Sequence, residues 1–276
     1  MKGSDDMKLT VLVDNNTYID QYYYGEPALC FYIEDENKKI LFDLGYTKAY
    51  AKNAYKMDIP IGDVDTIVFS HGHSDHTRGI IYYEKKYNLA KCRIIAHPLA
   101  FCKKELDGKS IGSPVSISEL FKKSMPVLSK GPIKVSKNLT FLGEIPSYND
   151  FEIRKPIGSI VGVRDSEKTD DYLLDDTALA YKNKDGIFII TGCSHSWICN
   201  IIEHAKKILS CDKILGVIGG FHLFDVDERT KKTVEYFEQN NITNLYPCHC
   251  VSFDVKSYIN SHIKINEVGV GLKIEI

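Results

Sequence analysis

The stretch FSHGHSDHTRGI, residues 69–80, decides how this sequence is interpreted. It holds His71, His73, Asp75 and His76 within six positions, although the whole chain has only nine histidines. The apolar run DTIVF before it predicts a strand, and GIIYYEKKY after it predicts a helix. Because ligands in α/β folds bind at the carboxyl ends of strands, we predict a functional site in this loop.

The residue types in the loop point to a metal site. His71 and His73 are two residues apart, and in an extended backbone their side chains point to one side, where they can bind one ion. Asp75 and His76 follow a turn and can bind a second ion. Imidazole suits zinc, iron or manganese, and a carboxylate adds a hard, negatively charged ligand. The alternative is a polar turn with incidental histidines, which four ligand-type residues directly after a buried strand disfavour.

The composition narrows the class of protein. A length of 276 residues fits one large α/β domain, so we expect a single domain over residues 1–276. A net charge of −2 gives no reason to expect a nucleic-acid partner. No apolar run approaches the ~20 residues of a membrane helix, and we expect no signal peptide because the apolar run near the start is too short for a signal-peptide core. We therefore expect a cytoplasmic protein with reduced cysteines and a small-molecule substrate, and the composition leaves the oligomeric state open.

Short apolar runs rich in β-branched and aromatic residues predict the strands of the first half. The first three lie close together and are separated by turn-like stretches, so we expect them to pair antiparallel. Helical stretches are expected at 48–57 and 79–87, and Ser116 with Glu119 forms a capping-box pattern. The predicted strands span residues 8–13, 28–33, 39–43, 65–69 and 92–96.

The second half opens with a predicted hairpin, in which residues 177–182 and 186–191 flank the turn NKDG. The order strand, helix, strand, helix, strand then predicts parallel strands covered by helices. Residues 158–176 are rich in Gly and Asp and predict a loop. Two strand-rich halves with outer helices favour an α/β fold of two facing mixed sheets, an αββα sandwich. The later elements are expected at 197–209, 213–218, 228–240 and 244–246.

The HxHxDH spacing of the loop resembles the signature of the metallo-β-lactamase superfamily. FDLG (42–45) resembles the family's strand that ends in Asp-x-Gly. The stretches TGCSH (191–195), GGFHL (219–223) and PCHC (247–250) resemble the branch of dihydropterin–ribofuranosyl-aminobenzene phosphate synthase-like proteins. The resemblance implies the αββα sandwich and a site for one or two divalent transition metal ions, with zinc first and iron or manganese as alternatives.

The resemblance also implies roles for individual residues. His71 and His73 would bind the first metal, Asp75 and His76 the second, and His249 matches the family's final histidine ligand. Common members have a bridging Asp in a Thr-Gly-Asp stretch, where this chain has Cys193, and His195 is the substitute ligand. A Gly-His-Thr motif is missing as well, so the number of metals stays open.

Further residues are candidates for supporting roles. His222 lies beyond the carboxyl end of the strand predicted at 213–218, and it is expected to act in catalysis, as a ligand or on substrate, with a structural hydrogen bond as the alternative. By the resemblance, Asp43 supports the metal loop and Asp176 orients a histidine. Asn15 and His97 are candidates for lining the site or binding substrate, against a polar turn and a structural role. His204 and His262 are predicted to be solvated surface residues.

The resemblance predicts hydrolysis of an ester, lactone, thioester, amide or phosphodiester by a metal-bound hydroxide, because bound metal lowers the pKa of water from about 15.7 to about 7. Asp75 would orient that hydroxide. Alternatives are a Ser194 or Cys193 nucleophile, a diiron redox protein, a non-hydrolytic binder, and a synthase acting on a pterin diphosphate. The redox members resemble HxExDH, whereas this chain has His73 at the Glu position.

Overall fold

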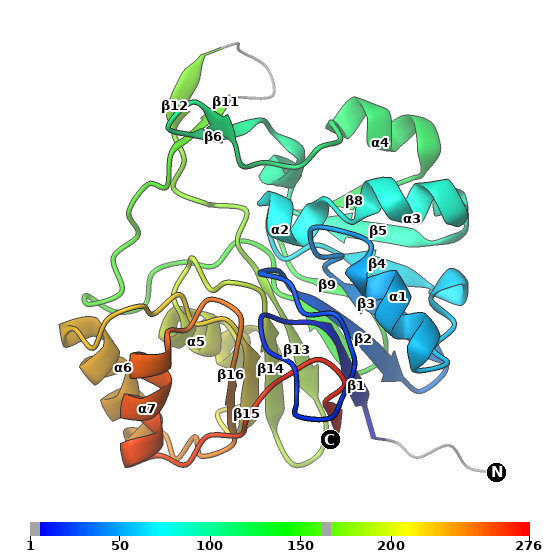
Figure 1. Ribbon diagram of the computed structural model, residues 1–276. Helices are drawn as coiled ribbons and strands as arrows, with labels where there is room; N and C mark the ends of the chain where they lie inside the picture. The colour runs from blue at the N-terminus through cyan, green and yellow to red at the C-terminus, as the bar shows by residue number, and fades with distance from the viewer. Residues whose placement is uncertain (1–5, 162–166) are drawn as a thin grey trace. The chain divides into compact units, whose positions relative to one another are not determined.

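The computed structural model describes residues 6–161 and 167–276. The chain, drawn in Figure 1, divides into two compact units by its internal contacts. Unit 1 comprises Met1–Lys130, Pro156–Asp175 and Gly269–Ile276, and unit 2 comprises Gly131–Lys155 and Asp176–Val268. The single domain expected over residues 1–276 stays a prediction.

Unit 1 is built on a mixed seven-stranded sheet that includes strands from both ends of the chain. The first strands pair antiparallel, as their spacing predicted, and the sheet continues with parallel pairs from β3 onward. The spatial order is β17 (Lys273–Glu275), β1 (Lys8–Val13), β2 (Cys30–Asp35), β3 (Lys38–Phe42), β4 (Thr66–Val68), β5 (Arg93–Ala96) and β8 (Val127–Leu128).

Helices cover this sheet because each buries one apolar side. In α1 (Ala49–Lys56) the buried side chains include Tyr50 and Ala54, and in α3 (Ile80–Lys86) they are Ile80 and Tyr83. These four side chains share one hydrophobic core with the sheet, and Figure 1 shows the two helices side by side. Other helical segments of the unit are η1 (Ile61–Asp63), α2 (Ser74–Thr77), η2 (Leu89–Lys91), η3 (Pro98–Phe101) and α4 (Ile117–Lys123).

A second, smaller sheet belongs to unit 1 and pairs segments far apart in sequence. Its strands are antiparallel throughout. The predicted loop 158–176 contributes two of them, so that prediction was wrong for those residues, and 162–166 lie outside the described residues. The spatial order is β12 (Lys168–Asp170), β11 (Ser159–Val161), β6 (Lys104–Leu106) and β7 (Lys109–Ser110).

Unit 2 contains a mixed six-stranded sheet whose second half follows the predicted strand–helix alternation. The hairpin β13–β14 is antiparallel, and β14, β15 and β16 run parallel. The spatial order is β16 (Leu245–Pro247), β15 (Ile214–Gly219), β14 (Ile187–Thr191), β13 (Ala178–Lys182), β10 (Leu139–Phe141) and β9 (Ile133–Lys134).

The helices of unit 2 pack on its own core. Helix α5 (Ile198–Leu209) buries Ile198, Ile201, Ile202 and Ala205, the residues whose helical spacing predicted this face. Helix α6 (Glu228–Gln239) begins at the cap Asp227, and α7 (Phe253–His262) was not predicted. The predicted helices and strands therefore appear close to their expected ranges, and the missed elements are short or terminal.

Candidate metal centre

In unit 1, the histidine loop leaves the carboxyl end of β4, as predicted. Ser70 and His71 follow the strand, His73 is the residue before α2, and α2 carries Asp75 and His76. A backbone hydrogen bond helps to fix the loop, because the Ser74 N–H donates to the Ile111 carbonyl at 2.8 Å. The rings of His71 and His73 lie 4.7 Å apart, and those of His71 and His76 lie 4.3 Å apart. The loop thus gathers its imidazoles within unit 1.

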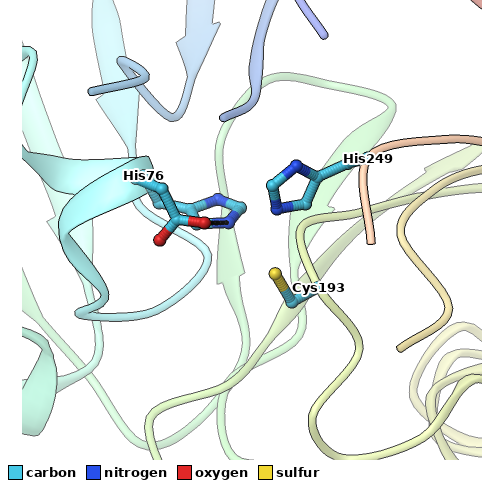
Figure 2. A group of neighbouring side chains, drawn as sticks. His76, Cys193 and His249 are labelled. Carbon is cyan, nitrogen blue, oxygen red and sulfur yellow. Dashed lines mark ion pairs between the residues drawn. The ribbon is translucent and has the colours of Figure 1, made fainter. Parts of the chain in front are cut away.

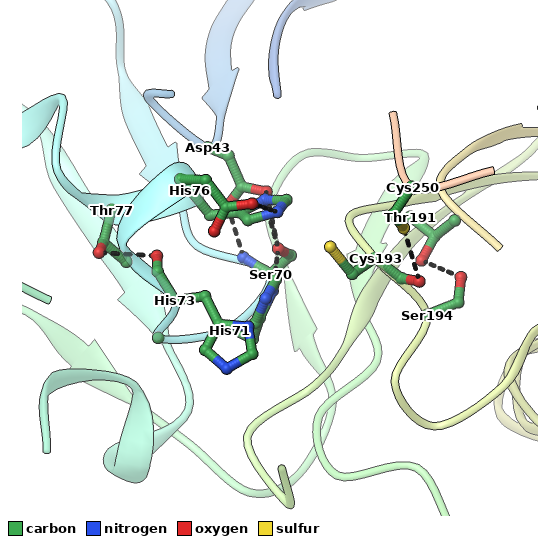
Figure 3. A network of polar contacts seen from close by, with 12 residues as sticks. Asp43, Ser70, His71, His73, His76, Thr77, Thr191, Cys193, Ser194 and Cys250 are labelled. Carbon is green, nitrogen blue, oxygen red and sulfur yellow. Dashed lines mark hydrogen bonds and ion pairs between the residues drawn. The ribbon is translucent and has the colours of Figure 1, made fainter. Parts of the chain in front are cut away.

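Asp43 organises these imidazoles through hydrogen bonds (Figure 3). Its carboxylate accepts the Ser70 N–H at 2.8 Å, the Ser70 hydroxyl at 2.6 Å and the His76 Nδ1 proton at 2.6 Å. Because the Ser70 hydroxyl donates to Asp43, its oxygen accepts from His71 Nδ1 at 2.9 Å. Both histidines therefore keep a lone pair on Nε2, and His76 Nε2 lies 3.6 Å from the Asp75 carboxylate. This is the arrangement that metal-binding imidazoles require.

His73 is held neutral by its surroundings. Burial lowers its pKa to about 4, and the Lys104 ammonium lowers it further, while Asp75 and Asp175 oppose the shift. A neutral imidazole has the lone pair that metal binding needs. His71 and His73 each place a ring nitrogen within 4.8 Å of the other.

A buried ion cluster supports the loop from the side of β6. The Lys104 ammonium contacts Asp171 at 2.7 Å and Asp175 at 2.9 Å, and all three side chains are buried. The Asp175 carboxylate also accepts the Gly72 N–H at 2.8 Å, between the two loop histidines. Burial lowers the pKa of Lys104, but the two carboxylates outweigh it and raise the pKa above its ordinary value. Lys104 therefore favours its charged form, and Asp175, whose pKa lies below its ordinary value because Lys104 outweighs the effect of burial, fixes the backbone at Gly72.

Gly72 has no room for a side chain. A Cβ there would lie 2.3 Å from the carbonyl oxygen of Ala100 and 2.9 Å from Lys104 Cε. The glycine is thus required by the close approach of the loop to its support.

In unit 2, the loops after three parallel strands carry the other candidate residues. Cys193 and His195 follow β14, His222 follows β15 and His249 follows β16. The backbone has positive φ at His222 (51°), at His249 (51°) and at Ser194 (59°), which non-glycine residues rarely adopt. Such strained residues cluster at functional sites, so their gathering at one edge of this sheet marks it as a candidate site.

The side chains at this edge of unit 2 lie close together. The rings of His195 and His222 are 4.4 Å apart, and Cys193 Sγ lies within 4.8 Å of a ring nitrogen of His249. Figure 2 shows the sulfur of Cys193 pointing toward the ring of His249. Cys193 and His249 thus offer a thiol and an imidazole of the kind that zinc binds.

Cys250 is a further polar group at this edge that sequence analysis did not predict. Its thiol donates to the Cys193 carbonyl at 3.4 Å (Figure 3). Burial raises the pKa of Cys250, but hydrogen bonds with Cys193 and His222 and the neighbouring His249 outweigh it, so its pKa lies below the ordinary value. All eight cysteines are free thiols.

Asp176 supports the turn that carries His195. Its carboxylate accepts the Ser196 N–H at 2.8 Å, and the Ser196 hydroxyl also contacts Arg154 at 2.6 Å. Burial raises the pKa of Asp176 to about 6 against the lowering effect of the hydrogen bonds from Ser196. Asp176 therefore holds the backbone beside His195. Within the described residues, the structure shows no hydrogen bond between the Asp176 carboxylate and a histidine ring.

The remaining candidates have other surroundings. His97 is buried and its Nδ1 accepts the Leu99 N–H at 3.2 Å, which caps η3. Asn15 is exposed in the loop after β1. His204 was predicted to be solvated, which was wrong, because it is buried and contacts the Tyr148 hydroxyl at 2.8 Å. The predicted exposure of His262 is confirmed.

Comparisons with known proteins agree with this geometry. The family model of the metallo-beta-lactamase superfamily matches residues 23–168. An uncharacterised protein of Methanocaldococcus jannaschii is 32% identical over 247 residues, which are 89% of this chain and 91% of that protein. The chain belongs to the metallo-beta-lactamase superfamily.

Two further proteins that are similar to this superfamily member have names that state an activity. A solved structure described as a metal-dependent hydrolase of the beta-lactamase superfamily has a TM-score of 0.81 at 26% identity, covering 98% of this chain and 99% of that chain. A 7,8-dihydropterin-6-methyl-4-(beta-D-ribofuranosyl)-aminobenzene-5'-phosphate synthase of Methanocaldococcus jannaschii is 28% identical over 274 residues, covering 94% and 92%. The branch resemblance is therefore confirmed, as is the α/β metallo-beta-lactamase fold with mixed sheets.

Several residues that support the histidine loop were not predicted from the sequence. Ser70 adjoins His71, and a hydroxyl next to a predicted ligand is a signal that could have been used. Asp175 stands beside the predicted Asp176, but nothing local shows that it contacts Gly72. No sequence pattern around Lys104 indicates that it supports the loop. No helix within the described ranges 6–161 and 167–276 has the length and apolar character to cross a membrane.

Proposed function

We propose that the protein is a metal-dependent hydrolase that acts on an ester, lactone, thioester or phosphodiester-type small molecule. The observation that carries the proposal is the Asp43 network, which holds Nδ1 of His76 directly and Nδ1 of His71 through the Ser70 hydroxyl, and so fixes the orientation of both rings. Metal-binding histidines almost always have their second ring nitrogen held by a carboxylate or another polar group in this way. The name of the relative at 26% identity supports the same class of activity.

The side chains present fit a divalent transition metal. We propose that the metal ligands of this chain are His71, His73, Asp75, His76, His195 and His249. Imidazole and carboxylate are ligands for zinc, iron and manganese, and zinc is the first metal to test, with one or two ions per chain. When bound, the metal would lower the pKa of water and polarise the bond to be cleaved.

The other residues would position the reactants. Asp75 is only partly buried, so its carboxylate can both bind metal and accept a proton from water beside it. His222 is half-buried, and the ring of Phe224 lies 4.9 Å from its own. We propose that His222 contacts the substrate or the leaving group. The net charge of −2 supports a small-molecule substrate rather than a nucleic acid.

A synthase activity is the second candidate, and the relative of that name supports it. The same residues would then act on a pterin diphosphate: the carbon–oxygen bond to the diphosphate would break, the diphosphate would leave, and the same carbon would bond to an organic nucleophile that loses a proton. The two candidates differ in the acceptor, which is water in the hydrolase and an organic nucleophile in the synthase.

The test is a panel of ester, lactone, thioester and phosphodiester substrates, with a pterin diphosphate assayed with and without an aromatic amine. We expect hydrolysis of at least one class, and a loss of about 10²–10⁴-fold in kcat for Asp75→Asn, the size of a general-base role. Asp65→Asn is the matched control, because Asp65 binds Lys38 and the Lys39 backbone away from the loop. Turnover of a good substrate by Asp75→Asn within a few-fold of the native rate would refute the mechanism.

A further inference from the structure

Unit 1 has a groove that the proposed hydrolase site does not use. It lies between α1 and α3 and has a volume of about 690 Å³. That volume falls within the roughly 300–1,000 Å³ of small-molecule sites. Half of the residues that line the groove are lysines, and none of the lining residues is acidic. The lysines are Lys48, Lys52, Lys56, Lys85 and Lys86.

The lysines are not neutralised by neighbours. All five are exposed, and no ion pair joins any of them to an acidic group among the residues that the structure describes. The nearby Glu84 instead pairs with Lys123 at 2.7 Å. A protein with a net charge of −2 therefore concentrates positive charge at one groove. Such a groove attracts an anionic ligand.

Helix stability does not explain this placement. Lys48 is the residue before the first turn of α1, and that turn has no acidic residue. A cation at a helix N-terminus opposes the macrodipole. Lys52 and Lys56 are four residues apart on the same helix, where like charges repel. The lysines in the last turn of α3 suit its dipole, so only the lysines of α1 are placed against helix stability.

Aromatic rings form the rest of the wall. Tyr24, Tyr55, Tyr82 and Tyr87 line the groove with Ala51. The ammonium groups lie over several rings, with Lys52 4.4 Å from the centre of the Tyr24 ring and Lys86 5.3 Å from that of Tyr87. The ring of Tyr55 is 80% exposed and is available for stacking. Aromatic rings stack on flat bases, and cations beside them attract phosphate groups. The two together suit a phosphorylated compound that carries an aromatic base.

We propose that the α1–α3 groove binds a compact ligand that combines several phosphate groups with an aromatic ring, of the nucleoside triphosphate class. The lysines contact the phosphates and Tyr55 stacks on the ring. The groove is separate from the residues that we assign to the metal, so the proposal stands whether or not the hydrolase assignment holds.

The test uses the full chain in equilibrium binding with ATP, tripolyphosphate and adenosine at low and high salt. We expect ATP to bind better than tripolyphosphate, adenosine to bind weakly or not at all, and added salt to weaken both anions. Lys52→Gln with Lys86→Gln should weaken ATP binding about tenfold, the sum of two exposed charge contacts. Tyr55→Ala should weaken ATP but leave tripolyphosphate unchanged.

Controls separate this groove from other sites. Lys231→Gln with Lys264→Gln removes two exposed lysines of unit 2 and should leave ATP binding unchanged. Asp75→Asn should also leave it unchanged, because a loss there would assign the ATP to the metal centre and overturn the proposal. No binding of ATP, or equal binding to the groove variant and the native chain, would also overturn it. Tighter binding of a single-stranded oligonucleotide than of ATP would assign the groove to nucleic acid and contradict our choice.

Discussion

Asp43→Asn is the substitution that bears most directly on how the ligand loop is oriented. Asn is nearly isosteric and tolerates the positive φ of 58° at this position, so the fold should persist. Its amide oxygen can still accept the Ser70 N–H, but its NH₂ group then faces His76 Nδ1. That nitrogen must become an acceptor, which moves the imidazole proton to Nε2, the atom meant for metal. Replacing such an orienting partner costs about 10–100-fold in metal affinity.

The expected loss corresponds to about 1.4–2.7 kcal/mol of binding free energy. Competition with a chromophoric chelator measures the metal Kd, and circular dichroism of the metal-free chain checks the fold. Ser70→Ala, which removes the hydroxyl between Asp43 and His71, should weaken binding in the same direction. Asp65→Asn should leave the Kd unchanged. A Kd for folded Asp43→Asn within twofold of the native value would refute this account of ligand orientation.

Three further predictions follow from the supports of the loop and from the thiol of unit 2. Lys104→Met leaves Asp171 and Asp175 buried without their cation, and denaturant unfolding should show a loss of about 3–5 kcal/mol, where a loss below 1 would contradict the buried ion cluster. Gly72→Ala places a methyl against a carbonyl oxygen and should destabilise the chain by about 1–3 kcal/mol and weaken metal binding, whereas native stability would show that the loop has room. Cys193 is buried and, if it faces the metal, should resist alkylation until chelator is added, so equal labelling with and without chelator would argue against that position.

Much of the fold follows from local patterns. The strand–helix alternation of unit 2 is visible because Ile198, Ile201 and Ile202 repeat at helical spacing and the strands are short apolar runs. The small sheet of unit 1 is not visible, because β11 (Ser159–Val161) and β6 (Lys104–Leu106) are three-residue strands whose pairing joins distant segments. Such short strands carry too few residues for a period-2 pattern to emerge.

The residues of the candidate site that are close in sequence could likewise be predicted, whereas those that are far apart could not. The HxHxDH loop is local, so its residues could be predicted together, and the family resemblance added Asp43. The contacts of Lys104 with Asp171 and Asp175 join residues that are 67 and 71 positions apart, and no short pattern reports them. The exposure of His204 was predicted wrongly because a polar residue on an amphipathic helix usually faces water. Here the Tyr148 hydroxyl and a backbone carbonyl contact its ring nitrogens.

The central claim is that this chain binds metal through the histidine loop and the histidines of unit 2. The most direct measurement is elemental analysis of the chain after purification without chelating resin and after reconstitution with zinc, iron or manganese. The account predicts one or two ions of a divalent transition metal per chain. A metal content no higher than trace levels, even after reconstitution of a folded chain, would contradict it.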